Sequence, residues 1–525
     1  MKGQLLLILF ALALVSSCSG DKSTQSGPLP RPNIIYIMAD DHANAAISAY
    51  GSKLIQTPNI DRIAKEGVLF QNSFVTNSIC APSRAVLLTG KYSHLNGLRD
   101  NSDKFDGSQV TFPKLLQQAG YYNSLVGKWH LKTAPTGFDY WNILTGQGEY
   151  YNPRMVENGD TSVHTGYTTD IITDIALKSL DNRDKTRPFC LLYHHKAPHR
   201  NWMPDAKHMD MFEDDLPPPK TFWDDYSNRS PAAKEADMRV ANMYLSQDMK
   251  LMPEDFGGVD PGTGGGGTRK GNPIKWWEGS YLRMNQEQKA AWDAHYDKMR
   301  QEFREKNPQG KERVEWMYQR YIKDYLRCIA SVDDNIGRML EYLDKNGLTE
   351  NTLIVYTSGQ GFYLGEHGWY DKRFMYEESL RMPLMMRYPA AIKAGQTTDA
   401  MTLNLDFAPT FLDIVGANVQ ENMQGRSLRP ILEGHTPDDW RTSMYYQYYE
   451  YPHGWHDVKR HYGVRTERYK LIHFYNDIDA WELFDLQKDP KELKNLYDDP
   501  AYQDVVTDLK KQLNGLRKDL QVPED

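Results

Sequence analysis

Short, continuous apolar segments recur along the chain, and each one stops at polar or charged residues. These segments are Asn33–Ala39, Pro188–Tyr193 and Thr352–Ser358. Tyr121–Val126, which follows a predicted helix, is expected to form a further strand. An unbroken apolar run of strand length, rich in β-branched residues, is typical of a strand buried on both faces. Amphipathic segments with helix start and stop signals lie between them, at Thr57–Gly67, Phe112–Gly120 and Glu315–Leu343. The pattern predicts an α/β fold in which helices flank a buried sheet.

The hydrophobic pattern changes twice later in the chain. Residues from about 205 to 309 contain a proline run, a glycine run and helical stretches rich in Trp, Lys and Glu. We expect an insertion that packs on the core and shapes a pocket. From residue 437 to 525, alternating apolar residues and turn signals predict a small antiparallel sheet, closed by a helix over Asp504–Leu520. This segment is expected to form a C-terminal α+β subdomain.

Residues 1–18 have the pattern of a bacterial export signal. A charged start precedes an apolar run from Leu5 to Val15 that is too short to span a bilayer. Val15-Ser16-Ser17-Cys18 resembles a lipobox, which implies cleavage before Cys18 and lipidation of that cysteine; an ordinary cleaved signal is the alternative. Residues 19–31 predict a flexible tether. We expect a lipid-anchored lipoprotein in the periplasm or on the outer membrane surface.

Composition narrows the possible partners. Charged residues make up 25% of the 525 residues and the net charge is −8, so no basic field points to nucleic acid. The chain has only 4 cysteines, which are too few for a disulfide framework.

Two adjacent carboxylates, Asp40 and Asp41, follow the first predicted strand. Open α/β sheets place their sites at this end of the strands. Adjacent carboxylates repel each other unless a cation neutralises them. A solvated turn is one interpretation, and ligation of a hard divalent ion, Ca²⁺ above all, is the other.

The segment Cys80-Ala81-Pro82-Ser83-Arg84 reads as a loop that enters a helix. Pro82 suits a first helical turn, because its missing N–H would have no partner there. Cys80 would then lie where the helix dipole attracts negative charge. Arg84 can reach back to the same place with a guanidinium suited to an oxyanion. The competing interpretation of Cys80 is a small buried hydrophobe.

The full pattern from Cys80, Cys-x-Pro-Ser-Arg followed by Ala-x-Leu-Leu-Thr-Gly-Lys-Tyr, resembles the signature of type I sulfatases. Gly-Lys-Trp-His-Leu at 127–131, Ala-Pro-His at 197–199 and the segment 358–379 are similar to further motifs of that family. The resemblance covers about 32–499. It implies an alkaline-phosphatase-like sandwich with a large mixed central sheet, a catalytic domain over 32–436 and the C-terminal subdomain.

The resemblance also implies a catalytic apparatus. Cys80 would be oxidised to formylglycine by a formylglycine-generating or anaerobic sulfatase-maturating enzyme, and the hydrate would be the nucleophile. Arg84, Lys128 and Lys372 would hold the sulfate, and His130 would serve as a base. His199 would be the general acid, or else a simple sulfate ligand. One Ca²⁺ would be held by a set of ligands that comprises Asp40, Asp41, Cys80 and Gln360.

Gly359 departs from the family pattern, which has a metal-ligand aspartate at that position. Loss of one carboxylate would weaken the calcium site. The alternative function is therefore a catalytically impaired lipoprotein that binds sulfated glycans. A phosphatase on the same fold would need a Ser or Thr nucleophile, and Cys80 argues against it.

Gly-Lys-Tyr-Ser-His at 90–94 and the His-rich segment near the C-terminal end look most like N-acetylglucosamine-6-sulfatases, which implies a sulfated saccharide of host or algal glycans as substrate. Iduronate-2-sulfate and galactose-6-sulfate remain open. Candidate sugar contacts precede the predicted C-terminal sheet, and they are also consistent with solvated loop residues: His453, His456, Arg460 and His461.

Overall fold

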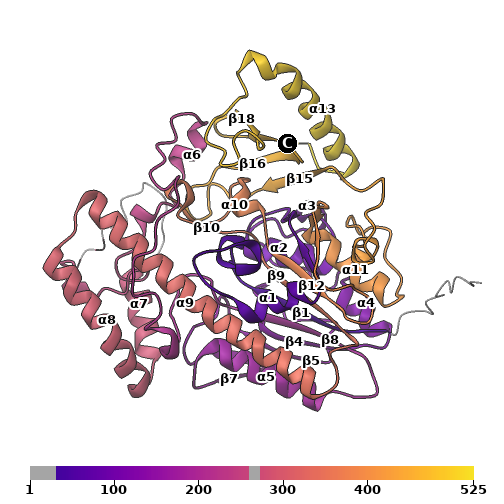
Figure 1. Cartoon of the computed structure of the whole chain (residues 1–525), viewed down its shortest axis with the longest axis horizontal. Coiled ribbons are helices and arrows are strands. Elements are labelled where there is room, and N and C mark those ends of the chain that lie inside the picture. Colours follow the sequence, from indigo (N-terminus) through magenta and orange to yellow (C-terminus); the bar gives the residue numbers. More distant parts are fainter. Residues whose placement is uncertain (1–30, 259, 261–271, 525) are drawn as a thin grey trace, which may run out of the picture.

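The computed structural model describes residues 31–258, 260 and 272–524 (Figure 1). The predicted export signal with Cys18, the tether as far as residue 30, and the glycine run at 262–267 lie outside the described residues. Within the described ranges, no helix has both the length and the apolar character needed to cross a bilayer.

A 10-stranded mixed sheet runs through the molecule in the order β13-β2-β12-β9-β1-β8-β4-β5-β6-β7. Its strands are β1 (Asn33–Ala39), β2 (Val68–Phe70), β4 (Tyr122–Lys128), β5 (Tyr140–Leu144), β6 (Arg154–Glu157), β7 (Asp160–Val163), β8 (Phe189–His195), β9 (Thr352–Ser358), β12 (Leu384–Arg387) and β13 (Gln396–Thr398). The central strands β9, β1, β8, β4 and β5 are parallel, so their carboxyl ends meet at one edge.

Helices cover both faces of this sheet (Figure 1). Helices α2 (Cys80–Thr89), α4 (Phe112–Gln118) and α11 (Phe407–Ile414) lie on one face, and α1 (Pro58–Lys65), α5 (Thr168–Asn182) and α9 (Gly310–Lys345) lie on the other. Strand β1 shows why an unbroken apolar run was needed. Tyr36 and Met38 belong to the first core cluster, whereas Ile35 and Ile37 belong to the second.

The region from 205 to 309 contains α6 (Pro231–Glu235), α7 (Pro273–Arg283) and α8 (Gln286–Lys306). Trp277 of α7 and Trp292 of α8 are buried in the same apolar cluster as α9. The insertion therefore shares the core of the sheet domain.

The C-terminal segment forms an antiparallel sheet of β15 (Ser443–Tyr448), β16 (His461–Thr466), β17 (Tyr469–Phe474) and β18 (Ala480–Asp485), on which α13 (Gln503–Asp519) packs. Its inner face belongs to the first core cluster. The predicted architecture, a large mixed sheet flanked by helices with a small antiparallel sheet at the C-terminal end, is confirmed. Short elements complete the chain: α3 (Ser93–Asn96), α10 (Glu377–Leu380), α12 (Arg429–Leu432), β3 (Ser73–Phe74), β10 (Tyr363–Leu364), β11 (Tyr370–Asp371) and β14 (Thr402–Leu403).

Candidate active site

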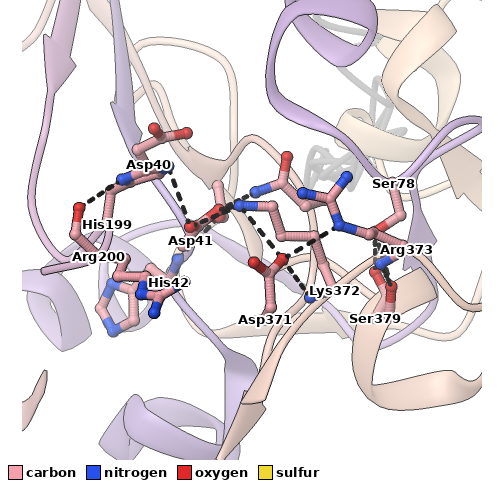
Figure 2. Close-up of polar contacts among 12 residues, drawn as sticks. Asp40, Asp41, His42, Ser78, His199, Arg200, Asp371, Lys372, Arg373 and Ser379 are labelled. Atoms are coloured by element: carbon pink, nitrogen blue, oxygen red, sulfur yellow. Dashed lines mark hydrogen bonds and ion pairs between the residues drawn. The ribbon is translucent and has the colours of Figure 1, made fainter. Parts of the chain in front are cut away.

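Polar side chains gather at the carboxyl edge of the parallel strands (Figure 2). Asp40 and Asp41 follow β1, Lys128 ends β4, His199 lies in the loop after β8, and Gln360 lies two residues after β9. The order of the strands explains this grouping, because β9, β1, β8 and β4 are neighbours in space although they are far apart in sequence.

Asp40 is fully buried between two cations. Lys128 Nζ donates to its Oδ2, and Arg84 Nη2 lies 3.4 Å from its Oδ1. Burial alone would raise the pKa of Asp40, but Lys128 and Arg84 outweigh burial and hold the pKa well below its usual range. Asp40 is therefore ionised across the physiological pH range.

Asp41 contacts a different cation. Lys372 Nζ lies 2.8 Å from Oδ1 and 2.7 Å from Oδ2, and the Gln360 amide also donates to Oδ1 (Figure 2). Burial raises the pKa of Asp41 to about 6, because Lys372 offsets only part of the burial and Asp40 adds repulsion. The pKa values of the two adjacent carboxyl groups are thus shifted in opposite directions.

The donor set fits a hard cation. Asp40 Oδ1 and Gln360 Oε1 are buried acceptors that have no hydrogen-bond partner among the described residues. Ligating atoms of Asp40, Cys80 and His199 lie within 4.8 Å of one another. Carboxylate and amide oxygens are the ligands that Ca²⁺ prefers. Asp40, Asp41 and Gln360 are accordingly able to hold such an ion.

Gly359 lies beside this cluster. A Cβ atom built on Gly359 would be 3.4 Å from Asp40 Oδ1 and 3.9 Å from Met38 Sδ, which are ordinary contact distances. The Gly359 carbonyl accepts a hydrogen bond from the Ser83 hydroxyl. The departure from the family pattern thus removes an oxygen ligand from the carboxylate cluster, at a position with room for a side chain.

Cys80 is the first residue of α2 and is only 2% exposed. Burial raises the pKa of the Cys80 thiol. Arg84, one turn later, is also buried and donates to the Lys128 carbonyl at 2.7 Å. The expected loop-to-helix geometry around Pro82 is present, and α2 directs its N-terminus and Arg84 toward the carboxylates.

The two histidines predicted to act as acid and base, His199 and His130, have different hydrogen-bond partners. His199 Nδ1 lies 2.7 Å from the Arg200 carbonyl, and its Nε2 lies 3.8 Å from Asp41 Oδ2. Burial, followed by the charges of Lys128 and Lys372, lowers the pKa of His199 well below its usual value. His130 has a buried Nδ1 with no partner in the described part of the chain, and burial lowers the pKa of its imidazole too.

A cavity of about 750 Å³ opens over the cluster. Asp41, Cys80, His199 and Lys372 line it at the catalytic centre. The insertion contributes α7 through Lys275, Trp276 and Arg283, and the loop between β15 and β16 contributes Trp455. The cavity is therefore built from the sheet edge, the insertion and the C-terminal subdomain.

The candidate sugar contacts separate into two groups. His453 and His456 line the cavity, and their Nε2 atoms lie 3.0 Å from Asp100 Oδ2 and 2.9 Å from Asp371 Oδ2, respectively. His461 does not line it: the side chain is buried, and its ring nitrogens meet the Lys459 carbonyl and the Met375 amide. The predicted sugar contact is therefore wrong for His461.

Arg460 also lies outside the cavity lining, and its Nε donates to the Tyr449 carbonyl at 3.0 Å. The expected sugar contact is thus not supported for Arg460 either.

Several cavity residues were missed by the sequence analysis. Asp371 and Arg373 flank Lys372, and both line the cavity. Arg373 Nη1 lies 2.5 Å from Glu450 Oε2. The carboxylate of Asp371 contacts the imidazole of His456. The proximity of Asp371 and Arg373 to Lys372 in the sequence was the available signal. Trp276 and Trp455 carried no motif that would have identified them.

Comparisons with known proteins match most of this chain. A family model described as Sulfatase matches residues 32–417, and one described as N-sulphoglucosamine sulphohydrolase, C-terminal, matches 365–519. An N-acetylglucosamine-6-O-sulfatase from Bacteroides thetaiotaomicron is 50% identical over 521 residues, which cover 98% of this chain and 90% of that protein. Human N-acetylglucosamine-6-sulfatase is 25% identical over 83% of this chain and 70% of its own length.

Solved structures extend the comparison. One that holds its substrate, D-glucosamine-2-N,6-O-disulfate, is 49% identical and aligns with a TM-score of 0.88, over 94% of this chain and 98% of that chain. The phosphonate monoester hydrolase of Agrobacterium radiobacter shares the fold alone, with 20% identity and a TM-score of 0.63 over 93% of this chain and 96% of that chain.

Proposed function

Because the chain belongs to the sulfatase family and is a sulfuric ester hydrolase, we propose that it removes 6-O-sulfate from N-acetylated or N-sulfated glucosamine in host or algal glycans. The observation that carries this proposal is the 49% identity to a structure that holds glucosamine-2-N,6-O-disulfate. The alternative of an impaired glycan-binding protein is not favoured, since the relative with 50% identity is an N-acetylglucosamine-6-O-sulfatase.

The sulfate group binds among the cations of the cluster. Arg84, Lys128 and Lys372 converge on the carboxylates next to Cys80, so a sulfate there meets positive charge from several sides. Such preorganised charge stabilises the negative oxygens of the transition state. After oxidation of Cys80 to formylglycine, the hydrated aldehyde supplies the nucleophile.

Asp40, Asp41 and Gln360, together with the hydroxyl derived from Cys80, would hold one Ca²⁺, which would supply positive charge for the sulfate oxygens. Asp40 Oδ1 and Gln360 Oε1 are buried acceptors without a hydrogen bond among the described residues, and they support this assignment.

His199 moves the proton to the departing sugar oxygen. In the free site the lowered pKa leaves the imidazole neutral, with its proton on Nδ1 toward the Arg200 carbonyl. An anionic sulfate ester next to Nε2 raises that pKa, so the bound complex protonates Nε2 and donates from it. When the S–O bond breaks, its electron pair stays on the sugar oxygen and takes this proton. His130 remains a proposed base for the second half of the reaction.

We also propose that the protein is a lipoprotein of the periplasm or outer membrane, anchored through Cys18. Its maturation partner is a formylglycine-generating or anaerobic sulfatase-maturating enzyme. The lipobox-like segment and the Cys80 motif support these assignments.

The test is sulfate release from N-acetylglucosamine-6-sulfate, N-sulfoglucosamine-6-sulfate and galactose-6-sulfate by protein made with a maturation enzyme and assayed with calcium. We expect release from the two glucosamine sulfates and none above background from Cys80→Ala, the matched control. Absence of release from both glucosamine sulfates, with Cys80 shown by mass spectrometry to be converted, would refute the proposal.

A further inference from the structure

Lys196 is a buried cation on the cavity wall that the chemistry above leaves without a role. It directly follows β8 and precedes His199 in the same loop. The residue is 3% exposed, yet it lines the cavity together with Asp41, Cys80 and His199.

The ammonium of Lys196 has few partners. Its Nζ lies 4.7 Å from the centre of the Tyr150 ring and donates to the Arg200 carbonyl at 3.4 Å. An ammonium group has three N–H donors. In residues 31–258, 260 and 272–524, no carboxylate forms an ion pair with Lys196, so most of its donor capacity is unused.

The other cations of the cavity wall differ from Lys196 in that carboxylates pair with them or water solvates them. Each of the following has a carboxylate partner: Lys372 with Asp41, Arg373 with Glu450, Arg200 with Asp248, and Arg283 with Glu149. Lys275 is exposed on α7, where water satisfies its charge. Lys196 is thus the buried cavity cation whose counter-charge is missing among the described residues.

A buried, unpaired cation is costly, and proteins normally neutralise or pair it. Burial and, to a smaller extent, the charge of Lys128 lower the pKa of Lys196 to about 8, and Asp40 and Glu149 partly oppose the shift. The charge is retained at neutral pH beside a cavity, so an anionic ligand group is the partner that this arrangement fits.

The position of Lys196 in the loop after β8 indicates which part of an anionic ligand its ammonium would contact. The His199 amide donates to the Lys196 carbonyl at 3.0 Å, so a tight turn holds the two residues together. Tyr150 connects them as well, because its hydroxyl donates to the His199 carbonyl at 2.6 Å and its ring underlies the Lys196 ammonium. The cations assigned to the sulfate oxygens come from other elements.

We propose that Lys196 is a further catalytic residue, whose ammonium donates a hydrogen bond to the ester oxygen that links sulfur to the sugar. This inference rests on the proposed function. As the S–O bond breaks, its electron pair passes to that oxygen, Lys196 stabilises the developing negative charge, and His199 Nε2 delivers the proton. Lys196 itself keeps its protons.

The experiment compares Lys196→Met with Lys178→Met, a matched loss of one lysine that is exposed on α5 and lies outside the cavity lining. Two quantities are measured on matured, calcium-loaded protein: kcat for N-acetylglucosamine-6-sulfate, and the Kd of inorganic sulfate by calorimetry. Inorganic sulfate carries no sugar leaving group. Its Kd therefore reports binding of the sulfate oxygens alone, whereas kcat also reports stabilisation of the leaving sugar oxygen. Thermal denaturation checks the fold, and Lys196→Gln replaces the Met variant if that variant is unfolded.

We expect Lys196→Met to lower kcat at least tenfold while the Kd of sulfate stays within twofold, and Lys178→Met to change neither by more than twofold. A loss of kcat below tenfold would overturn the inference. So would a parallel loss of kcat and sulfate affinity, which would place Lys196 among the sulfate ligands or in a purely structural role. Inactivity of the parent protein on this sugar would instead refute the proposed function, and this inference with it.

Discussion

At the scale of single residues, the adjacent carboxylates Asp40 and Asp41 are held in different states. Lys128 and Arg84 keep Asp40 ionised, whereas the burial of Asp41 exceeds what Lys372 can offset. A proton therefore competes with a bound cation for the Asp41 carboxylate near pH 6. It does not compete for the Asp40 carboxylate in this pH range.

This difference predicts how calcium binding depends on pH. Asp41 has a pKa of about 6, so it is ionised at pH 7.5 and mostly protonated at pH 5. Competition by one proton weakens binding about tenfold over that interval. Calorimetric titration with Ca²⁺ should show this loss, with no change between pH 7.5 and 8.5, where Asp41 is ionised at both values. An affinity unchanged at pH 5 would show that Asp41 is not a ligand.

Gly359→Asp should strengthen the same site. The added Cβ lies at a contact distance from Asp40 Oδ1, so the backbone does not need to move. Opposite charges about 4 Å apart attract by about 4 kcal/mol at an effective dielectric of 20. We expect Ca²⁺ to bind at least ~10-fold tighter, which corresponds to about 1.4 kcal/mol.

Gly359→Asn, which adds the same volume without the charge, is the control for this variant. If the Asp and Asn variants bound Ca²⁺ equally, charge at position 359 would not be the missing contribution.

The motifs located most of the side chains that the structure brings together at the carboxyl edge of the sheet, because these side chains are fixed by the strand or helix that carries them. His461 shows the limit of such reasoning. It is the first residue of β16, and its side chain stacks on Phe374 and Tyr446 in the core. Proximity in sequence to a rim loop does not reveal which face of a strand a side chain occupies.

At the scale of elements, two segments that are far apart in the sequence lie side by side at the cavity. Trp276 of α7 and Trp455 of the loop between β15 and β16 have ring centres 6.0 Å apart, and both line the cavity. Aromatic faces pack on the apolar faces of sugar rings, so this pair is placed to hold the part of the substrate outside the catalytic centre.

Trp276→Ala should therefore raise KM for N-acetylglucosamine-6-sulfate about tenfold and leave kcat within threefold, because the residue is remote from the reacting atoms. Steady-state kinetics measure both constants. Trp223→Ala removes a tryptophan that is 46% exposed and lies outside the cavity lining, and it should change neither constant. An effect of Trp276→Ala on kcat alone would contradict the assignment.

The strands of the central sheet were predictable because burial on both faces requires an unbroken apolar sequence. The edge strands were not. Strand β7 is exposed along its whole length and reads Asp-Thr-Ser-Val, which has no apolar period. The insertion was expected to shape a pocket, but the sequence did not show that α7 is the helix that reaches the cavity, since this depends on where the insertion folds back and not on any pattern within it.

At the scale of the molecule, the sheet domain and the C-terminal subdomain share one apolar core and a buried ion network. Lys470 of β17 lies 2.9 Å from Glu377 of α10 and 2.6 Å from Glu492, with no exposure of Lys470 or Glu492. The pair between Lys470 and Glu377 therefore links the C-terminal sheet to α10 of the sheet domain.

Lys470→Met should therefore destabilise the protein by about 3–5 kcal/mol, since it removes the cation that pairs with the fully buried Glu492. Lys491→Met is the control: its ammonium is 54% exposed and pairs with Glu378 at 3.1 Å, so the cost should be about 0–1 kcal/mol. Urea unfolding followed by fluorescence and circular dichroism measures both. Equal costs for the two variants would show that the network contributes nothing beyond surface pairing.

The burial of Cys80 has a consequence for the order of events during synthesis. In the finished protein the thiol lies at the start of a buried helix, where a second enzyme has no access to an extended segment around it. The groups that close over it arrive late: Gln360 and Lys372 bond to Asp41 across 319 and 331 residues of chain. The proposed maturation enzyme would therefore have an interval that opens when residue 80 emerges and closes when β9 and the Lys372 loop join the sheet. Chains that folded before modification would keep a thiol at the base of the cavity, on a segment that is already helical.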